Sequence, residues 1–283
     1  MKINKQWFKE EYSSLKLLNK TIFKNPRTHI IAIVLPLIVS FFVYWLWNRY
    51  SIYKITPPEM LAFSTITILF STFYIGIFTY EAKETSFLRR IYLKNNSKAN
   101  IFIALLIVSS EIYVVNTILG LLLYYGMSKI SIIGLNSELF NNILPFMWIY
   151  FVLTTFVSMV LLTFIFVLLA GVFKNKYACF GVMFLVFLFL LIFSDVAIPP
   201  IQSNSIFFNV VGYFNPWKYS NWTMLLFTSY QVFDPEGMGQ IFLPTNSNWP
   251  PFNNIAQTII PSFAFIGLFI FLNIKYFTFS LKS

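Results

Sequence analysis

The stretch MLAFSTITILFSTFYIGIFTY, residues 60–80, contains no charged side chain. It is as long as the roughly 20 apolar residues that a helix needs to cross the hydrocarbon core of a bilayer. The next stretch, EAKETSFLRRIYLKNNSKAN at 81–100, is rich in Lys and Arg, and a second apolar run begins at residue 101. This alternation predicts two membrane-spanning helices joined by a short polar segment.

The composition of the whole chain supports the same interpretation. Of its 283 residues, 58% are hydrophobic and 11% are charged, whereas a soluble domain typically carries about a quarter charged residues. Ordinary globular packing cannot hide so much apolar surface, so we expect an all-α polytopic membrane protein. The net charge of +10 does not require a nucleic-acid partner, because basic residues also collect at the cytoplasmic ends of membrane helices.

Six stretches are long and apolar enough to predict a span. They lie at about 30–48, 60–80, 101–125, 143–173, 177–198 and 256–274. The fourth exceeds the required length, so we expect it to be tilted or broken near its start. Pro36 and Pro261 fall inside spans, where neighbouring helices can satisfy the carbonyl groups that proline leaves free.

The distribution of Lys and Arg predicts the orientation. With the N-terminus inside, sixteen of the twenty basic residues fall on cytoplasmic segments. Both termini and residues 81–100 are then cytoplasmic by the positive-inside rule. The abundance of Phe, Ile, Asn and Lys is typical of an AT-rich bacterial genome, so we expect a multi-pass protein of the bacterial cytoplasmic membrane.

Residues 1–29 form a cytoplasmic segment whose pattern predicts an amphipathic helix from Lys5 to Lys24, ended by Pro26. Apolar side chains recur every three or four residues at Phe8, Tyr12, Leu15, Leu18 and Ile22. A basic amphipathic helix of this kind lies along lipid headgroups, so we expect it to anchor the chain there.

Residues 81–100 carry a smaller apolar stripe of their own. It consists of Phe87, Leu88, Ile91 and Tyr92, with Arg89, Arg90 and Lys94 on other faces. This spacing predicts a short cytoplasmic helix. An exposed stripe can press on headgroups or fill a groove in another protein, and the pattern alone favours neither.

The sequence ETSFLRRIYLKNNSKANIFIALLI resembles the loop between the second and third spans of ABC type-2 transporter permeases. That family often shows an acidic residue, a short run ending in Leu-Arg-Arg-like residues, and a polar patch before the next span. The corresponding positions are Glu84, Leu88, Arg89, Arg90, Ile91 and Ser97. Ser86 stands where the family often has glycine, and 94–96 replace its common Thr-Pro step.

Two further segments extend this resemblance over most of the chain. The amphipathic segment 1–29 is similar to the connecting helix of the family. After the fifth span, IPPIQSNSIFFNVVGYFNPWKYSNWTM resembles its outer re-entrant stretch. There Pro199 and Pro200 precede a short helix, and the Asn215-Pro216 step follows it.

The resemblance implies a permease subunit that couples to a separate ABC ATP-binding subunit, present in two copies, through a coupling helix at 84–94. It assigns this coupling to Glu84, Phe87, Leu88, Arg89, Arg90, Ile91 and Tyr92. It also implies a second permease, identical or similar. The chain lacks the G-x-x-x-x-G-K-[ST] loop that cradles nucleotide phosphates. We therefore expect no cofactor on this chain and no enzyme activity, with ATP and Mg²⁺ on the partner.

Residues 199–255 form an outer segment with three charged and thirteen aromatic side chains. Because aromatic rings favour the headgroup level, we expect an aromatic re-entrant lid of short helices in the outer interface. It is either a belt that fixes depth in the membrane or an exit gate for an amphipathic cargo. The candidate gate residues are Asn215, Pro216, Trp217 and Trp222.

Glu111 is the one acidic residue predicted near the centre of a span. A carboxylate there is costly unless it is protonated, hydrogen-bonded or facing water. We expect either a hydrogen bond across helices or, together with Asn116, a place on the cargo path. Asp195, near the outer end of the fifth span, is expected to be solvated. His29 has no Cys or acidic cluster at ligand spacing, so metal binding is not expected.

Two functions remain open on these residues. The first is the permease subunit of an ATP-driven ABC exporter that moves an amphipathic cargo, such as a peptide, lipid-linked molecule or drug, outward. The alternative is a non-transporting membrane immunity or sensor protein that docks a peptide at its outer face. An intramembrane enzyme is disfavoured, because the sequence contains no recognisable catalytic cluster.

Overall fold

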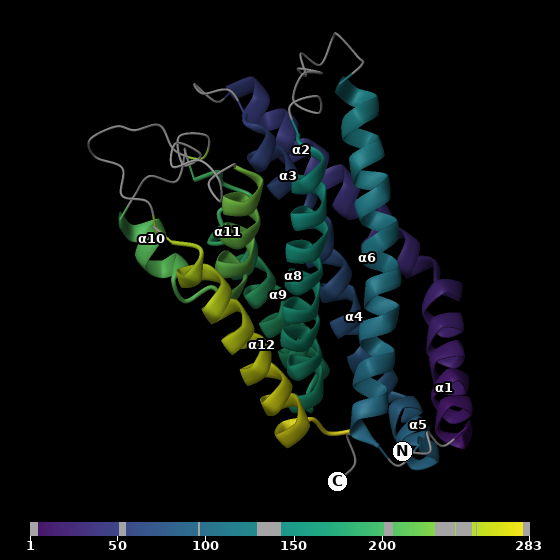
Figure 1. Ribbon diagram of the computed structural model, residues 1–283. Helices are drawn as coiled ribbons and strands as arrows, with labels where there is room; N and C mark the ends of the chain where they lie inside the picture. The colour runs from purple at the N-terminus through teal and green to yellow at the C-terminus, as the bar shows by residue number, and fades with distance from the viewer. Residues whose placement is uncertain are drawn as a thin grey trace.

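The structure is a computed structural model that describes residues 5–50, 55–95, 97–128, 143–200, 206–229, 241, 251–252 and 254–279. Among these residues it contains helices and no strand (Figure 1). The helices are α1 (Lys5–Lys24), α2 (Leu35–Tyr50), α3 (Pro57–Ser64), α4 (Ile66–Glu84), α5 (Phe87–Asn95), α6 (Lys98–Ser128), α8 (Pro145–Val172), α9 (Lys176–Ile192), α10 (Ile206–Gly212), α11 (Pro216–Thr228) and α12 (Ala256–Tyr276), with a π-helical segment at Thr28–Val34.

Five helical stretches are long and apolar enough to cross a membrane. They are Thr28–Tyr50, Pro57–Glu84, Lys98–Gly126, Pro145–Val172 and Ala256–Tyr276. The expectation of an all-α polytopic membrane protein is therefore confirmed. The predicted fifth span at 177–198 is a shorter helix, because α9 has 17 residues and gives way to turns after Ile192.

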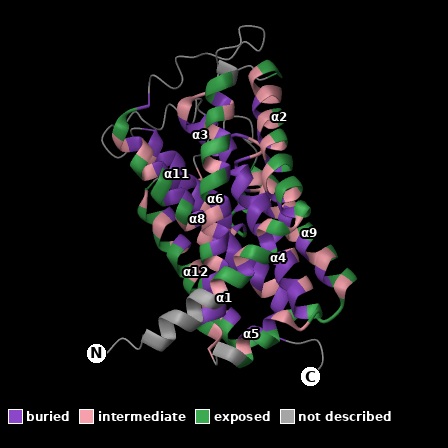
Figure 2. Ribbon diagram, turned by 90° about the vertical axis from the view of Figure 1, so that its right-hand side faces the viewer, coloured by how far each residue is buried: buried purple, intermediate pink, exposed green. Residues whose placement is uncertain are grey.

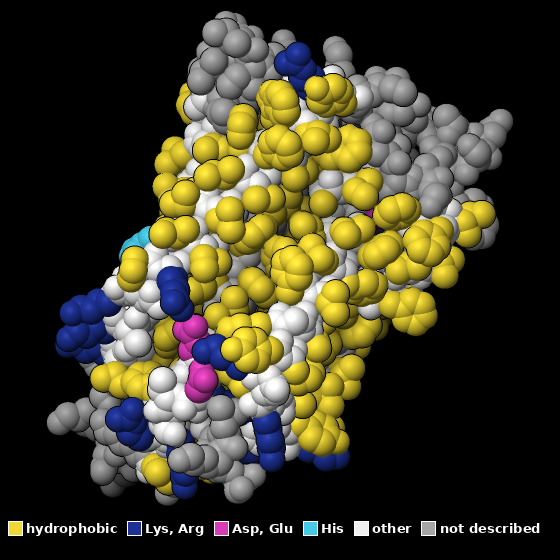
Figure 3. Space-filling view, turned by 180° about the vertical axis from the view of Figure 1, so that it is seen from behind, with side chains coloured by type: hydrophobic (Ala, Val, Ile, Leu, Met, Phe, Trp, Pro, Cys, Tyr) yellow, Lys and Arg dark blue, Asp and Glu magenta, His cyan; other side chains and the backbone are white. Residues whose placement is uncertain are grey.

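The helices have a common direction that defines two ends of the molecule. Helix α5, the start of α1 and the end of α12 lie together at one end (Figure 1). We call this the inner end, following the charge asymmetry of the sequence, and the opposite end the outer end. In Figure 3 most of the visible Lys and Arg side chains gather towards one end, and apolar side chains cover the surface above them.

Two span predictions need correction in detail. The span predicted at 60–80 is two helices, α3 and α4, which meet at Thr65. The Thr65 hydroxyl donates to the Ala62 carbonyl over 2.6 Å, and that of Thr67 donates to Ser64 over 2.8 Å. Such side-chain bonds compete with the helical ladder and bend it. The fourth span was expected to be tilted or broken near its start, and it is unbroken: α8 is one helix from Pro145 to Val172.

Pro36 confirms that a neighbouring helix satisfies a carbonyl group that proline frees. Proline has no N–H to donate to the Ala32 carbonyl four residues earlier, and the chain is π-helical from Thr28 to Val34. The side-chain amide of Asn116 on α6 donates to that carbonyl over 2.6 Å. The amide therefore fixes α6 against the first span.

Helix α4 lies at the centre of the bundle and packs most extensively against α8. Figure 2 shows buried residues concentrated on α4 and α11, and exposed residues on α6 and α2. Contact between α4 and α8 depends on Gly76, because a Cβ atom there would lie 2.7 Å from the Cβ atom of Phe166. Helices α2 and α12 expose large apolar side chains such as Ile38 and Phe263, as expected for a surface that lipid covers.

Candidate functional site

Helix α5 connects the inner ends of α4 and α6. The chain turns into it through Ser86, whose φ of 57° lies in the left-handed region. Ser86 stands where the permeases that this sequence resembles often have glycine. Glycine adopts positive φ without a steric penalty. The turn sends α5 back beneath the bundle, where it packs against α1, α4 and α6.

The apolar stripe of α5 is not an exposed docking surface, which corrects the expectation from the sequence. Leu88 is 0% exposed and Ile91 is 5% exposed, and both belong to a core cluster that includes Leu18 and Ile22 of α1. Tyr92 is half-buried and stacks on Phe279, with ring centroids 4.6 Å apart. These side chains hold α5 in place.

The surface that α5 presents is formed by other residues. Arg89, Arg90 and Leu93 are exposed, and Leu93 is exposed by 65%. Glu84, at the end of α4, is exposed too and forms an ion pair with Lys176 of α9 at 3.0 Å. The predicted coupling residues therefore divide into two groups. One is apolar and buried or half-buried (Phe87, Leu88, Ile91 and Tyr92), and the other is charged and exposed (Glu84, Arg89 and Arg90).

A residue that sequence reasoning missed joins α4 to α8. The Lys83 side chain is 0% exposed, and its Nζ donates to the carbonyls of Ala170, Gly171 and Phe173 at 3.1, 2.6 and 2.9 Å. The last carbonyls of a helix have no partner within the helix and carry its negative dipole end. The buried Lys83 ammonium group supplies both the hydrogen-bond donors and the positive charge that the C-terminus of α8 needs.

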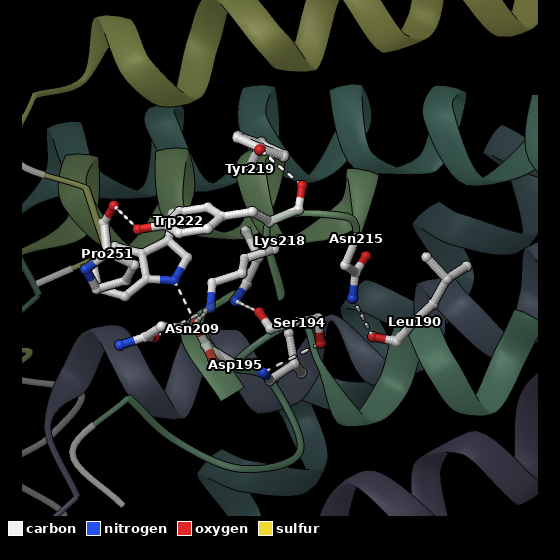
Figure 4. Close-up of polar contacts among 12 residues, drawn as sticks. Leu190, Ser194, Asp195, Asn209, Asn215, Lys218, Tyr219, Trp222 and Pro251 are labelled. Carbon is white, nitrogen blue, oxygen red and sulfur yellow. Dashed lines mark hydrogen bonds and ion pairs between the residues drawn. The ribbon is translucent and has the colours of Figure 1, made fainter. Parts of the chain in front are cut away.

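The outer site centres on a buried ion pair. Lys218 Nζ lies 2.9 Å from Asp195 Oδ2, and the two side chains are 0% and 3% exposed. Trp222 Nε1 donates to the same carboxylate oxygen over 2.6 Å, and Asn209 accepts from Lys218 over 3.5 Å (Figure 4). The expectation that Asp195 is solvated is therefore wrong. Its carboxylate is buried, and Lys218 supplies the opposite charge that a buried carboxylate needs.

The backbone around this pair is shaped to admit it. Asp195 adopts φ 60°, in the left-handed region, where the chain leaves α9. A Cβ atom at Gly212 would lie 2.6 Å from Lys218 Nζ, so a side chain there would displace the ammonium group. Tyr213 donates from its hydroxyl to the Pro251 carbonyl over 2.9 Å. Burial and the Asp195 carboxylate raise the pKa of Tyr213, which keeps its hydroxyl a donor.

The predicted gate residues come together at the start of α11. Asn215 caps the helix by accepting from the Trp217 N–H at 2.9 Å, and Pro216 takes the first helical position, where its missing N–H has no cost. Asn215 also donates to the Leu190 carbonyl of α9 over 3.0 Å. Trp217 and Trp222 are 0% exposed.

Helix α11 is buried within the bundle and packs against α8 and α12. The sequence predicted an aromatic re-entrant lid here, and in the structure α11 is enclosed by other helices. In Figure 1, α10 and α11 form a hairpin at the outer half of the molecule, with α10 at the edge of the bundle. The rest of the aromatic segment at 230–240 and 242–250 lies outside the described residues.

Glu111 and Asn116 face different neighbours, although both lie on α6. Glu111 accepts a hydrogen bond of 2.6 Å from the side-chain amide of Asn19 on α1, so the expected bond across helices is present. Asn116 is 0% exposed and donates to Ala32 and to the Ser71 hydroxyl, each over 2.6 Å. The two residues do not form one polar cluster.

Among the described residues no group of three His, Cys, Asp or Glu side chains is placed to hold a metal ion. The chain matches no protein-family model, no curated protein and no solved structure. The described residues therefore define a helical multi-pass membrane protein. Its two candidate sites are the inner helix α5 and the outer hairpin, of which α11 is buried and α10 is largely exposed.

Proposed function

We propose that this chain is the permease subunit of an ATP-driven ABC exporter of the type-2 class. A separate ATP-binding subunit, present in two copies, holds ATP and Mg²⁺ and docks at the exposed face of α5. A second permease, identical or similar, completes the pathway in the bacterial cytoplasmic membrane. An amphipathic cargo, such as a peptide, a lipid-linked molecule or a drug, moves outward between the permeases.

The observation that carries this proposal is the way α5 is joined to the bundle. A helix that transmits force must be firmly attached to the helices that it moves. Leu88 and Ile91 bury the face of α5 that packs on the bundle, and Lys83, four residues before the start of α5, is bonded to the end of α8. A push on Arg89 or Arg90 therefore moves α4, α5 and α8 together.

Helix α8 supplies a route from the inner end to the outer hairpin. Its 28 residues span about 42 Å at the usual rise of about 1.5 Å per residue. Lys83 holds its inner end, and Ser158 near its middle donates to the Ser220 hydroxyl of α11 over 3.0 Å. A displacement of α8 thus reaches α11, where the predicted gate residues Trp217 and Trp222 lie.

The outer hairpin has a second attachment through α9. Asn215 bonds to the Leu190 carbonyl at the end of α9, and Asn221 donates to the Ser194 carbonyl over 3.0 Å. The ion pair between Asp195 and Lys218 joins the same two segments. Helix α9 begins at Lys176, beside Glu84. Helices α8 and α9 therefore both connect the inner end to the hairpin.

The test is co-purification of ATPase activity with the tagged full chain, extracted in mild detergent from cells of its source organism. We expect the variant with Arg89→Glu and Arg90→Glu to lose the associated activity by about tenfold or more, since each tenfold corresponds to about 1.4 kcal/mol of binding. The melting temperature of the chain should not change, because both side chains are exposed.

The control is Arg49→Glu, a charge reversal at an exposed arginine at the end of α2. It should leave the associated ATPase activity intact. Wild-type protein that purifies without ATPase activity would overturn the proposal and favour the immunity or sensor protein instead. Activity that survives reversal of both α5 arginines would contradict docking at α5.

A further inference from the structure

A polar groove lies between α1 and α6. Its volume is about 560 Å³, within the range of about 300–1,000 Å³ that small-molecule sites occupy. The groove is lined by Leu15, Lys16, Asn19, Lys20, Phe23 and Glu111. It therefore brings two lysines, one carboxylate and one amide together on a surface that is otherwise apolar.

Helix α1 presents these groups on one face because Lys16, Lys20 and Phe23 are separated by three or four residues. The opposite side of α1 is fixed, since Leu18 and Ile22 are 0% exposed and pack into the core. The lysine side chains are exposed. Two exposed lysine side chains therefore border the groove, on a helix whose opposite face is packed into the core.

The groove contains one carboxylate, that of Glu111. Asn19 Nδ2 donates to Glu111 Oε2 at 2.6 Å, which orients the Glu111 carboxylate. A carboxylate offers about four lone-pair sites, so Glu111 can still accept from the N–H donors of a ligand in the groove.

The depth of the groove matches the inner headgroup region. Helix α6 has 31 residues and is about 46 Å long at about 1.5 Å per residue, well beyond the roughly 30 Å of hydrocarbon. Helix α1 rises from the inner end beside α6 (Figure 1), and the exposed Lys24 and Arg27 follow Asn19 along the chain. Because those charges need water or headgroups, we infer that the groove opens at the level of the inner headgroups.

An apolar track on α6 leads away from the groove. Ile107, Val114, Val115 and Ile118 lie three, four or seven residues from Glu111 and are between 36% and 54% exposed. This spacing places them on the same face as Glu111. Acyl chains that extend from a headgroup in the groove would lie along this face.

We propose that the groove binds phosphatidylethanolamine from the inner leaflet. The headgroup phosphate pairs with Lys16 and Lys20, and the primary ammonium donates to the Glu111 carboxylate. The site does not depend on transport, since it needs only α1, α6 and lipid. It clamps the amphipathic helix α1 to the bundle through a lipid that contacts both helices.

Other headgroups fit these groups less well. The trimethylammonium of phosphatidylcholine has no N–H and cannot donate a hydrogen bond to the Glu111 carboxylate. Phosphatidylglycerol brings a negative charge without a positive one, so Glu111 has no cationic partner beside that anion. Both lipids would still meet Lys16 and Lys20, so the site distinguishes headgroups by what they offer to Glu111.

The test uses the purified full chain in nanodiscs that contain phosphatidylethanolamine, phosphatidylcholine and phosphatidylglycerol with identical acyl chains. Lipids that remain bound after transfer to detergent are counted by native mass spectrometry. We expect the ethanolamine lipid to be retained about threefold over either competitor, as for a partly exposed ion pair. Glu111→Gln should remove this preference over phosphatidylcholine and leave the melting temperature unchanged, because glutamine can still accept from Asn19.

Two variants on α1 separate the groove from general attraction to the membrane. Lys16→Ala with Lys20→Ala should lower retention of all three lipids, whereas Lys24→Ala, an exposed lysine outside the groove, should not. Equal retention of the ethanolamine and choline lipids by the wild type would overturn the proposal. So would stronger retention of the glycerol lipid, or displacement by phosphoethanolamine, which lacks acyl chains and would indicate a site for a soluble phosphate compound.

Discussion

Lys83 Nζ lies 2.6 Å from the Gly171 carbonyl oxygen, and two further carbonyls at the end of α8 accept from the same ammonium group. The two residues are 88 positions apart in the chain. One side chain thus joins the central helix, immediately before α5, to the C-terminus of its main packing partner. The Lys83 side chain is fully buried, so water cannot take its place as the donor to these carbonyls.

We expect Lys83→Met to destabilise the protein by several kcal/mol, since each hydrogen bond to a charged group contributes about 1.5–3 kcal/mol. The methionine fills a similar volume and leaves three carbonyls without their donor. The matched control is Lys176→Met, which removes the exposed ion pair with Glu84 and should change stability by less than about 1 kcal/mol. Thermal unfolding in detergent measures both, and an equal effect would contradict the role of Lys83.

We expect Asp195→Asn or Lys218→Met alone to destabilise the outer hairpin by about 3–5 kcal/mol, because each leaves one buried charge without its partner. The double variant should recover a large part of that loss, since it leaves neither charge. Thermal unfolding followed by tryptophan fluorescence reports on this region, where Trp222 bonds to Asp195. Additive losses in the double variant would mean that the two charges do not interact.

The burial of the α5 stripe predicts that Leu88→Asp prevents folding or lowers the melting temperature strongly, because it places a carboxylate among apolar side chains. Leu93→Asp is the matched substitution on the same helix, at a side chain that is 65% exposed, and should leave the melting temperature nearly unchanged. Size-exclusion profiles and thermal unfolding distinguish the two. Normal folding of the Leu88 variant would restore the stripe as an exposed docking surface.

Asn116→Leu should destabilise the first span by about 1–3 kcal/mol, the usual effect of an unpaired buried polar group. The loss falls on the Ala32 carbonyl, which Pro36 cannot bond and which would keep only the long 3.4 Å hydrogen bond from the Ser71 hydroxyl. The same substitution in a Pro36→Ala background should be less damaging, because alanine supplies the missing N–H. A double-mutant cycle measured by thermal unfolding tests this coupling, and strictly additive effects would refute it.

Regular periodicity in the sequence predicted much of the fold. The spacing of apolar residues gave α1 its bounds at Lys5 and Lys24, which the structure confirms, and hydropathy located the long apolar helices. Periodicity shows which face of a helix is apolar but not what covers it. For that reason the stripe at Leu88 and Ile91 could be interpreted as exposed, although α1 and α6 bury it.

The partners of the polar residues were beyond sequence reasoning for a different reason. The sequence singled out Glu111 and predicted a hydrogen bond across helices, but it did not indicate Asn19, 92 positions away, as the donor. Asp195 lies near a predicted span end and Lys218 in the predicted outer segment, where a charged residue is normally solvated. One signal was present in the sequence: Lys83 lies three residues after the end of a long apolar run, where a lysine is either at the surface or bonded to helix carbonyls. Only the packing of α8 decides between the two.

The separation between the buried and the displayed faces of α5 has an evolutionary consequence. Leu88 and Ile91 pack α5 against the bundle, whereas Arg89, Arg90 and Leu93 are exposed and do not contribute to this packing. After a gene duplication, the second set could diverge until the copy recognised a new cytoplasmic protein, while the membrane part stayed intact. A family built on this scaffold should therefore vary fastest at those three positions and slowest at the residues beside them.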